Sequence, residues 1–196
     1  MTHHARDTVE QHLSSTQFAY RTDSSCTDAL VSMQHAVYSY LHKPNCKAVH
    51  LFAMDFSKAF DCVNHEMLSN KLKRLPLHPH NINYWYLSFH DNRQQRVVYN
   101  SFEGQWKKIN TGTIQLGSVS SPYWFNIVIN DLDLVLANQP ALFKYADNSS
   151  IIVPIWSNGL SRKDLVDEFL TWTNNNKIVC NPVKCKEMVF HKSNYI

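Results

Sequence analysis

Apolar residues recur three or four positions apart in several segments, which is the spacing of an amphipathic helix. In residues 27–41 this spacing predicts a core-facing helix, with Ser24 or Ser25 available to cap its amino end. The apolar stripe of this helix consists of Leu30, Met33, Val37 and Leu41. The same spacing predicts four further helices, over residues 64–75, after Pro79, over residues 121–137 and over residues 161–172.

Shorter apolar runs predict strands between these helices. AVHLFAMDF, residues 48–56, is typical of a buried strand, and it places Asp55 at its carboxyl end. Two hairpins are expected: RQQRVVYNSFEGQWKKIN turning at Glu103-Gly104, and ALFKYA joined to SSIIVPIW at Asp147-Asn148. A last short pair of strands ends the chain. This order predicts an α+β fold, with a split βαβ, antiparallel-rich sheet and helices packed on one face.

Composition places the chain among globular proteins of one domain. Its 196 residues are 44% hydrophobic and 18% charged, enough to bury a core. No apolar stretch approaches the ~20 residues of a membrane helix, and the polar start MTHHARDTVEQH lacks the apolar centre of a signal peptide, so we expect an intracellular protein of the nucleus or cytoplasm, with no membrane partner and no secretion. The net charge of +3 permits a nucleic-acid partner without demonstrating one. The five cysteines form no CxxC pair and are expected to be reduced thiols.

Two aspartates stand out by their expected positions. Asp55 closes a strand and Asp147 lies on a hairpin turn much later in the chain, so only folding brings them together. Two carboxylates held close repel each other, and a hard divalent cation such as Mg²⁺ relieves that repulsion. Such a pair is the outline of a two-metal site for phosphoryl transfer. Taken alone, each aspartate is more commonly a solvated cap at a strand end or a turn.

Three segments resemble a known family in its own order. FAMDFSKAFDCVNH, GTIQLGSVSSPYWFNIVINDL and YADN are similar to the three palm motifs of the reverse transcriptase domain of non-LTR, LINE-like retrotransposons. QFAYR and SCTDAL resemble the block ahead of that palm, and NPVKCKEMVF resembles the motif after the third. The resemblance therefore covers residues 17–190 and implies a fragmentary copy of such a transposable element.

The resemblance implies an RNA-directed DNA polymerase, a nucleotidyltransferase that adds deoxynucleoside triphosphates to a DNA primer on an RNA template. It implies a polymerase palm-like fold with partial fingers. The domains would be partial fingers and a lead-in helix over 1–45, the palm over 46–192 and a tail over 193–196. The implied cofactor is Mg²⁺, with Mn²⁺ as the alternative.

The resemblance also implies a role for individual residues. Asp55 and Asp147 would bind the metals, and Lys184, with Lys186 as the alternative, would protonate the pyrophosphate leaving group. The nucleotide-binding residues would be Phe56, through its backbone, Phe60, whose ring would exclude a 2′-hydroxyl, and Gln115, which would contact the nucleotide or template. The nucleic-acid-binding residues would be Arg93 and Arg96. From the residues alone, a core aromatic, a solvated amide or an exposed cation is the ordinary alternative.

This chain departs from the family pattern at two positions. Asn148 stands where the family has a second aspartate, so the metal site would lose one negative charge. Leu116 separates Gln115 from Gly117, where the family runs Gln directly into Gly-Ser. Fuller fingers before Gln17 and a thumb after residue 192 are also expected to be missing. The alternatives to an active polymerase are therefore a catalytically inactive, nucleic-acid-binding palm and a decayed remnant of the element.

Overall fold

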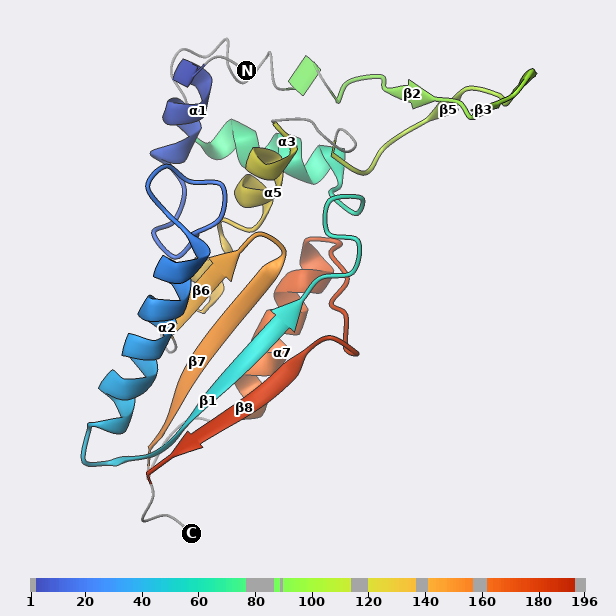
Figure 1. Ribbon diagram of the computed structural model, residues 1–196. Coiled ribbons are helices and arrows are strands. Elements are labelled where there is room, and N and C mark those ends of the chain that lie inside the picture. The colour runs from blue at the N-terminus through green and yellow to red at the C-terminus, as the bar shows by residue number, and fades with distance from the viewer. Residues whose placement is uncertain are drawn as a thin grey trace.

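A four-stranded antiparallel sheet forms the centre of the molecule (Figure 1). The computed structural model describes residues 3–76, 87–88, 90–113, 120–136, 141–156 and 162–192. The strands lie in the order β6-β7-β1-β8. Their bounds are Cys46–Asp55 for β1, Ala141–Tyr145 for β6, Asn148–Trp156 for β7 and Lys186–His191 for β8. The predicted α+β fold, the buried strand that ends in Asp55 and the second hairpin are confirmed.

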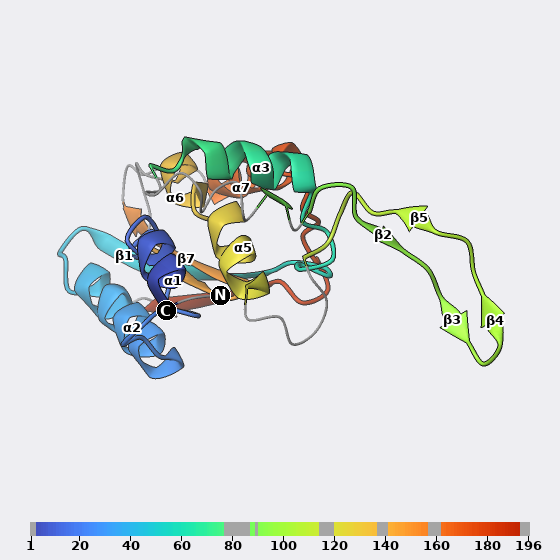
Figure 2. The same cartoon turned by 90° about the horizontal axis from the view of Figure 1, so that it is seen from above.

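Helices cover both faces of this sheet, so the prediction that they lie on one face was wrong (Figures 1 and 2). Helix α2 (Cys26–Leu41) packs with Val49 and Ile152 on one face. Helix α7 (Arg162–Asn175) packs with Phe52 and Ile151 on the other, as does α5 (Ser121–Val128). Side chains alternate between the two faces of a strand, and β1 is apolar on both, so each face needs a cover.

The helix ends follow the capping residues. Ser25 caps α2 and forms a reciprocal capping box with Asp28, and Asn64 caps α3 (His65–Arg74) through the backbone N–H of Met67 at 2.9 Å. Within α2, Leu30 is 59% exposed and does not belong to the core, contrary to prediction. The buried stripe of α2 instead follows Ala29 and Val37, because Leu30 lies about 100° around the helix from Ala29.

The single helix predicted over residues 121–137 is two helices, α5 and α6 (Leu132–Val135). The residues between them bind distant parts of the chain with their side chains. Asn130 accepts a hydrogen bond from the backbone N–H of Ser14 at 2.7 Å. Asp131 accepts one from the Lys71 ammonium at 2.7 Å and one from the Trp172 indole at 3.1 Å. The predicted apolar stripe is nevertheless buried, at Phe125, Ile129, Leu132 and Leu136.

Both hairpins turn one or more residues away from the predicted dipeptide. In the second hairpin Asn148 pairs with Tyr145, so the turn is Ala146-Asp147, with Ala146 at a φ of 53°. In the first, the turn is Asn100-Ser101 and not Glu103-Gly104, because Asn100 takes the positive φ, also 53°.

The first hairpin forms a narrow ribbon that projects from the body of the molecule (Figures 1 and 2). Its strands are β2 (Gln94–Gln95), β3 (Val98–Tyr99), β4 (Phe102–Glu103) and β5 (Lys107–Lys108). The predicted last pair of strands is a single strand, β8, preceded by an isolated bridge between Phe56 and Cys180. Helix α1 spans His3–Glu10.

Some predictions concern residues outside the described ranges: the helix after Pro79, and both Gln115 and the inserted Leu116. Among the described helices, none has the length and apolar character that crossing a membrane requires.

Candidate active site

Strand pairing brings the two predicted metal-binding segments to one end of the sheet. Asp55, the last residue of β1, lies directly opposite Asn148, the first residue of β7. Asp147 precedes Asn148 in the hairpin turn. Residues paired in this way have Cβ atoms about 5 Å apart and point to the same face. The fold therefore places Asp55 beside the segment that contains Asp147 and Asn148.

The Asp55 carboxylate is nearly buried and forms an ion pair with Lys184. Asp55 is 9% exposed, and its Oδ1 accepts no hydrogen bond from any residue that the structure describes. The Lys184 ammonium lies 3.7 Å from this oxygen, an ion-pair distance that is too long for a hydrogen bond. The Lys184 side chain is 65% exposed, so it can leave Asp55 without opening the core.

A tight turn after α7 holds Lys184 in this place. The backbone N–H of Asn181 donates to the carbonyl of Asp55 at 2.8 Å, and the N–H of Lys184 donates to the carbonyl of Asn181 at 3.1 Å. The turn is thus attached to the end of β1 by its own backbone. Lys186, the alternative in the sequence, instead begins β8 and pairs with Ala53, and its ammonium donates to the carbonyl of Val183 at 3.2 Å.

Two thiols lie close to the backbone of Asp55. The Sγ atoms of Cys180 and Cys185 are 3.3 Å apart, and Cys185 Sγ is 4.0 Å from the Asp55 carbonyl oxygen. Burial raises the pKa of Cys180 to about 12, and the hydrogen bond with Cys185 and the negative charge of Asp55 act in the same direction. All five cysteines of the chain are free thiols, as expected.

The two phenylalanines of the first motif are packed in different ways. Phe56 is 2% exposed, and its ring stacks on Phe169 with centroids 5.8 Å apart, so its side chain belongs to the core. Phe60 is only partly buried and packs against Phe125 with centroids 5.0 Å apart. The Phe60 carbonyl accepts a hydrogen bond from the N–H of Thr113 at 2.8 Å. Thr113, the last described residue before Gln115, therefore lies beside Phe60.

Tyr20 is a residue near the site that sequence reasoning missed. The segment before it runs along β6, where the N–H of Phe18 donates to the carbonyl of Lys144 at 2.9 Å. Partial burial raises the pKa of Tyr20, and the negative charges of Asp147 and Tyr145 raise it further. The only signal in the sequence was the place of Tyr20 in QFAYR, ahead of the palm motifs.

Comparison with known proteins decides the family of this chain. Residues 1–195 match the family model described as reverse transcriptase (RNA-dependent DNA polymerase). The chain belongs to the reverse transcriptase family. No curated protein matches it.

Solved telomerase structures share the fold of this reverse transcriptase chain. Apo telomerase from Candida tropicalis, truncated from its C-terminal domain, matches with a TM-score of 0.67 and 12% identity, over 97% of this chain and 41% of that one. Telomerase from Candida tropicalis in complex with the TWJ fragment of telomeric RNA matches with a TM-score of 0.64 and 12% identity, over 89% and 30%. Telomerase from Candida albicans in complex with the same type of fragment gives 0.61 and 12%, over 97% and 35%. The chain thus spans about a third of the length of the telomerases it matches.

Arg96 of this reverse transcriptase chain lies on the projecting ribbon, whereas Arg93 precedes β2 and lines a hollow with Asp61 and Thr113. The Arg96 guanidinium forms an ion pair with Glu103 and lies over the Trp106 ring, 4.8 Å from its centroid. Arg93 precedes β2 and accepts a backbone hydrogen bond from the N–H of Ile109 at 2.9 Å. In the described part of the chain, neither arginine forms an ion pair with Asp55 or Asp147.

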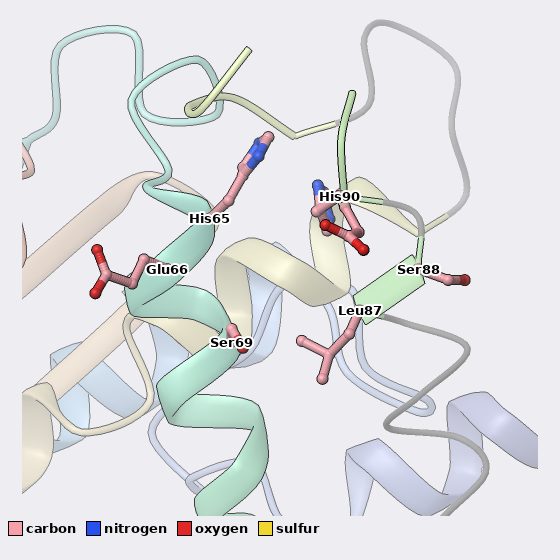
Figure 3. Close-up of a pocket in the computed structure, with 7 residues that line it drawn as sticks. His65, Glu66, Ser69, Leu87, Ser88 and His90 are labelled. Atoms are coloured by element: carbon pink, nitrogen blue, oxygen red, sulfur yellow. The ribbon is translucent and has the colours of Figure 1, made fainter. Parts of the chain in front are cut away.

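A separate hollow of about 380 Å³ lies beside α3 (Figure 3). His65 and Ser69 on α3 form one wall, and Leu87, Ser88 and His90 form the other (Figure 3). His90 is 8% exposed, and burial lowers its pKa to about 4, with the nearby His65 and Arg93 acting in the same direction. Within the described ranges, no group of three or more His, Cys, Asp or Glu side chains could hold a metal ion. Neither the hollow nor the end of the sheet at Asp55 therefore presents three such side chains together in the described part of the chain.

Proposed function

We propose that this chain is the palm of an RNA-directed DNA polymerase from a non-LTR retrotransposon, with partial fingers in residues 1–45, the palm in 46–192 and a tail in 193–196. It would transfer deoxynucleotides to the 3′-hydroxyl of a DNA primer on an RNA template. The observation that carries the proposal is the register of β1 and β7, which pairs Asp55 with Asn148 and so brings Asp147 to the same end of the sheet. Membership of the reverse transcriptase family supports the same chemistry.

The donor set at this end of the sheet fits a hard divalent cation. Asp55 offers a buried carboxylate oxygen without a hydrogen-bond donor among the described residues, and the turn adds the Asp147 carboxylate and the Asn148 amide oxygen. Oxygen ligands of this kind suit Mg²⁺, and Mn²⁺ as the alternative. When bound, such a cation neutralises the charge that develops on the phosphate oxygens.

The remaining residues would bind and orient the substrates. The Phe60 ring, partly buried against Phe125, would lie under the sugar and exclude a ribose 2′-hydroxyl, with the Phe56 backbone beside the triphosphate and Gln115 at the base or template. Lys184 would move away from Asp55 and give its proton to the pyrophosphate, because its side chain is largely exposed and free to move. The ion pair seen with Asp55 would then hold Lys184 close to the reaction between turnovers.

The ribbon would contact the nucleic acid away from the reaction centre. Between residues 93 and 108 it has four cations, Arg93, Arg96, Lys107 and Lys108, against one carboxylate, Glu103. Tyr99 and Phe102 pair across β3 and β4 and are 74% and 81% exposed, so two aromatic rings stand side by side near the tip. Cations that follow phosphates, together with aromatic rings on which bases stack, are the elements of single-strand binding.

Neutralising the two ribbon lysines should weaken binding to RNA. Lys107→Ala with Lys108→Ala removes two phosphate partners, so the slope of log affinity against log salt should become shallower by about 1.4. Fluorescence anisotropy with a labelled single-stranded RNA at several salt concentrations measures this slope. The matched control is Lys47→Ala with Lys73→Ala, which removes the same charge from exposed positions elsewhere. Equal slopes for the two double variants would exclude the ribbon as a binding surface.

Restoring the second aspartate tests the polymerase proposal itself. Asn148→Asp adds a negative charge beside Asp55 and Asp147, so the affinity for Mg²⁺ should rise about tenfold. Isothermal titration of Mg²⁺ into the natural chain and the variant measures this affinity. Extension of a DNA primer on an RNA template is measured in parallel, with Asp55→Asn in each background as the inactive control. We expect extension that depends on Mg²⁺ and Asp55, stronger in the Asn148→Asp variant.

Asn148 also favours a second function, an inactive palm that grips nucleic acid. An amide brings no negative charge, so the natural chain holds the cation less firmly than a site with a third carboxylate. This alternative would be supported if the natural chain and the Asn148→Asp variant both bind RNA in a salt-dependent way and neither extends the primer. Extension that is equal with and without Asp55 would instead show that the polymerase activity does not belong to this chain.

A further inference from the structure

Cys180 and Cys185 are the only pair among the five cysteines, all of which lie in the described ranges, whose sulfur atoms are in contact. Their Sγ atoms are 3.3 Å apart. The other thiols lie elsewhere: Cys26 is exposed at the start of α2, Cys46 is buried at the start of β1, and Cys62 has its Sγ 3.6 Å from the Ser57 carbonyl oxygen. Proximity therefore selects one pair.

The backbone fixes both residues on either side of a short turn. Cys180 forms an antiparallel bridge with Phe56, next to the hydrogen bond from the N–H of Ser57 to the carbonyl of Val179 at 2.7 Å. The N–H of Cys185 donates to the carbonyl of Asn181 at 3.1 Å. A disulfide has a sulfur separation of about 2.05 Å, so the sulfur atoms need to approach by only about 1.3 Å. Rotation of two partly exposed side chains supplies such a movement.

We propose that Cys180 and Cys185 are a dithiol oxidation site, which small-molecule disulfides convert into an intrachain disulfide. In the first step one cysteine sulfur attacks the small-molecule disulfide, forming a mixed disulfide and releasing one small thiol. The second cysteine then attacks the mixed disulfide, forming the Cys180–Cys185 bond and releasing the second small thiol. Two S–H bonds are lost from the chain, and the two electrons and two protons leave with the two small thiols.

The position of the pair connects it with the candidate active site. The disulfide would close a loop of residues 180–185, which contains Lys184. The Lys184 ammonium lies 3.7 Å from Asp55 Oδ1, and Cys185 Sγ lies 4.0 Å from the Asp55 carbonyl oxygen. Closing the disulfide would therefore restrict the turn that presents Lys184 to Asp55. This consequence rests on the proposed function, whereas the oxidation site itself does not.

Peptide mapping tests the site in the full, natural chain without any activity assay. The reduced protein is equilibrated with glutathione and glutathione disulfide, trapped with an alkylating agent and digested with trypsin. Cleavage after Lys177, Lys184 and Lys186 places the two cysteines in separate peptides, IVCNPVK and CK. We expect two products of the linkage: the two peptides joined by a disulfide, or the uncut peptide IVCNPVKCK with a mass lower by two hydrogen atoms than its reduced form. Together they should be at least tenfold more abundant than the linked peptides of any other cysteine pair. Dithiothreitol should reverse the change.

Variants separate this linkage from general thiol reactivity. Cys62→Ser should leave the linked peptides unchanged, and Cys185→Ser should abolish them and leave Cys180 alone or joined to glutathione. The fraction of the exposed Cys26 that becomes joined to glutathione shows whether the oxidant was strong enough to react with an accessible thiol. The proposal is overturned if Cys26 reacts fully while Cys180 and Cys185 remain unlinked, or if either is found joined to another cysteine. Loss of polymerase activity in a chain that still forms the link would concern only the proposed function.

Discussion

Asp133→Ala should lower the free energy of unfolding by about 3–5 kcal/mol, because it leaves a buried cation without its partner. Lys144 on β6 is 0% exposed, and its ammonium lies 3.1 Å from Asp133 Oδ2 and 3.2 Å from the carbonyl oxygen of Ile129. Burial lowers the pKa of Lys144, and Asp133 is the main group that opposes this effect. Urea denaturation followed by circular dichroism measures the loss.

Two controls separate the ion pair from the other contacts of Asp133. The Thr16 hydroxyl donates to Asp133 Oδ1 at 2.8 Å, so Thr16→Val measures that contact by itself. Lys144→Met removes the cation, and Asp133→Ala added to it should then cost clearly less than in the natural chain, since the uncompensated charge is gone. An effect of Asp133→Ala below about 1 kcal/mol, or one equal in both backgrounds, would contradict a structural role for the pair.

The ion pair between Lys144 and Asp133 also supports the position of Asp147. The N–H of Lys144 donates to the carbonyl of Thr16 at 2.8 Å, and Gln17 forms a parallel bridge with Lys144. β6 thus binds the amino-terminal segment on one edge and β7 on the other, directly before the turn that contains Asp147. Loss of the ion pair should therefore loosen this turn as well as lower the stability of the whole chain.

Lys144 also shows why sequence patterns predicted the candidate site but not the contacts that support it. The apolar run of β1 and the polar dipeptide after ALFKYA were enough to predict a strand ending in Asp55 and a hairpin turn that contains Asp147, because strand ends and turns are local features. A lysine within a strand ordinarily predicts a solvent-facing position. Its burial depends on Asp133, which reaches it only through the folding of α6 against β6. Partners of this kind leave no periodic signal.

The differences in the helices and turns have the same origin. The stripe of residues 121–137 was predicted correctly, but the break at Asn130 and Asp131 follows from hydrogen bonds to Ser14, Lys71 and Trp172. The cover on the second face of the sheet was missed although β1 is apolar on both faces, because that pattern does not show which helix packs on which face. The motif resemblance located Asp55, Asp147 and Lys184 more closely than periodicity did, while their roles stay predictions.

His90 should make the chain lose stability as the medium becomes acidic. Its folded-state pKa of about 4 lies below the ordinary value of 6.5, so the folded state favours the neutral ring. The stabilisation is therefore fully present above about pH 6.5 and is lost as the pH falls towards 4, by up to about 3 kcal/mol in total. Urea denaturation at several pH values between 7.5 and 4 measures the change.

His90→Phe isolates this contribution from the carboxylates that titrate in the same range. A phenylalanine ring keeps the edge-to-face contact with Trp124, whose centroid lies 5.0 Å from that of His90, but it cannot take up a proton. The variant should lose stability less steeply between pH 6.5 and 4 than the natural chain. The matched control, His35→Gln, changes a solvent-exposed histidine and should keep the natural slope. Parallel slopes for His90→Phe and the natural chain would show that folding does not lower the pKa of His90. A shallower slope for His90→Phe would show that the acid sensitivity arises at the packing of α3 against α5. Phe125 of α5 also contacts Phe60 there.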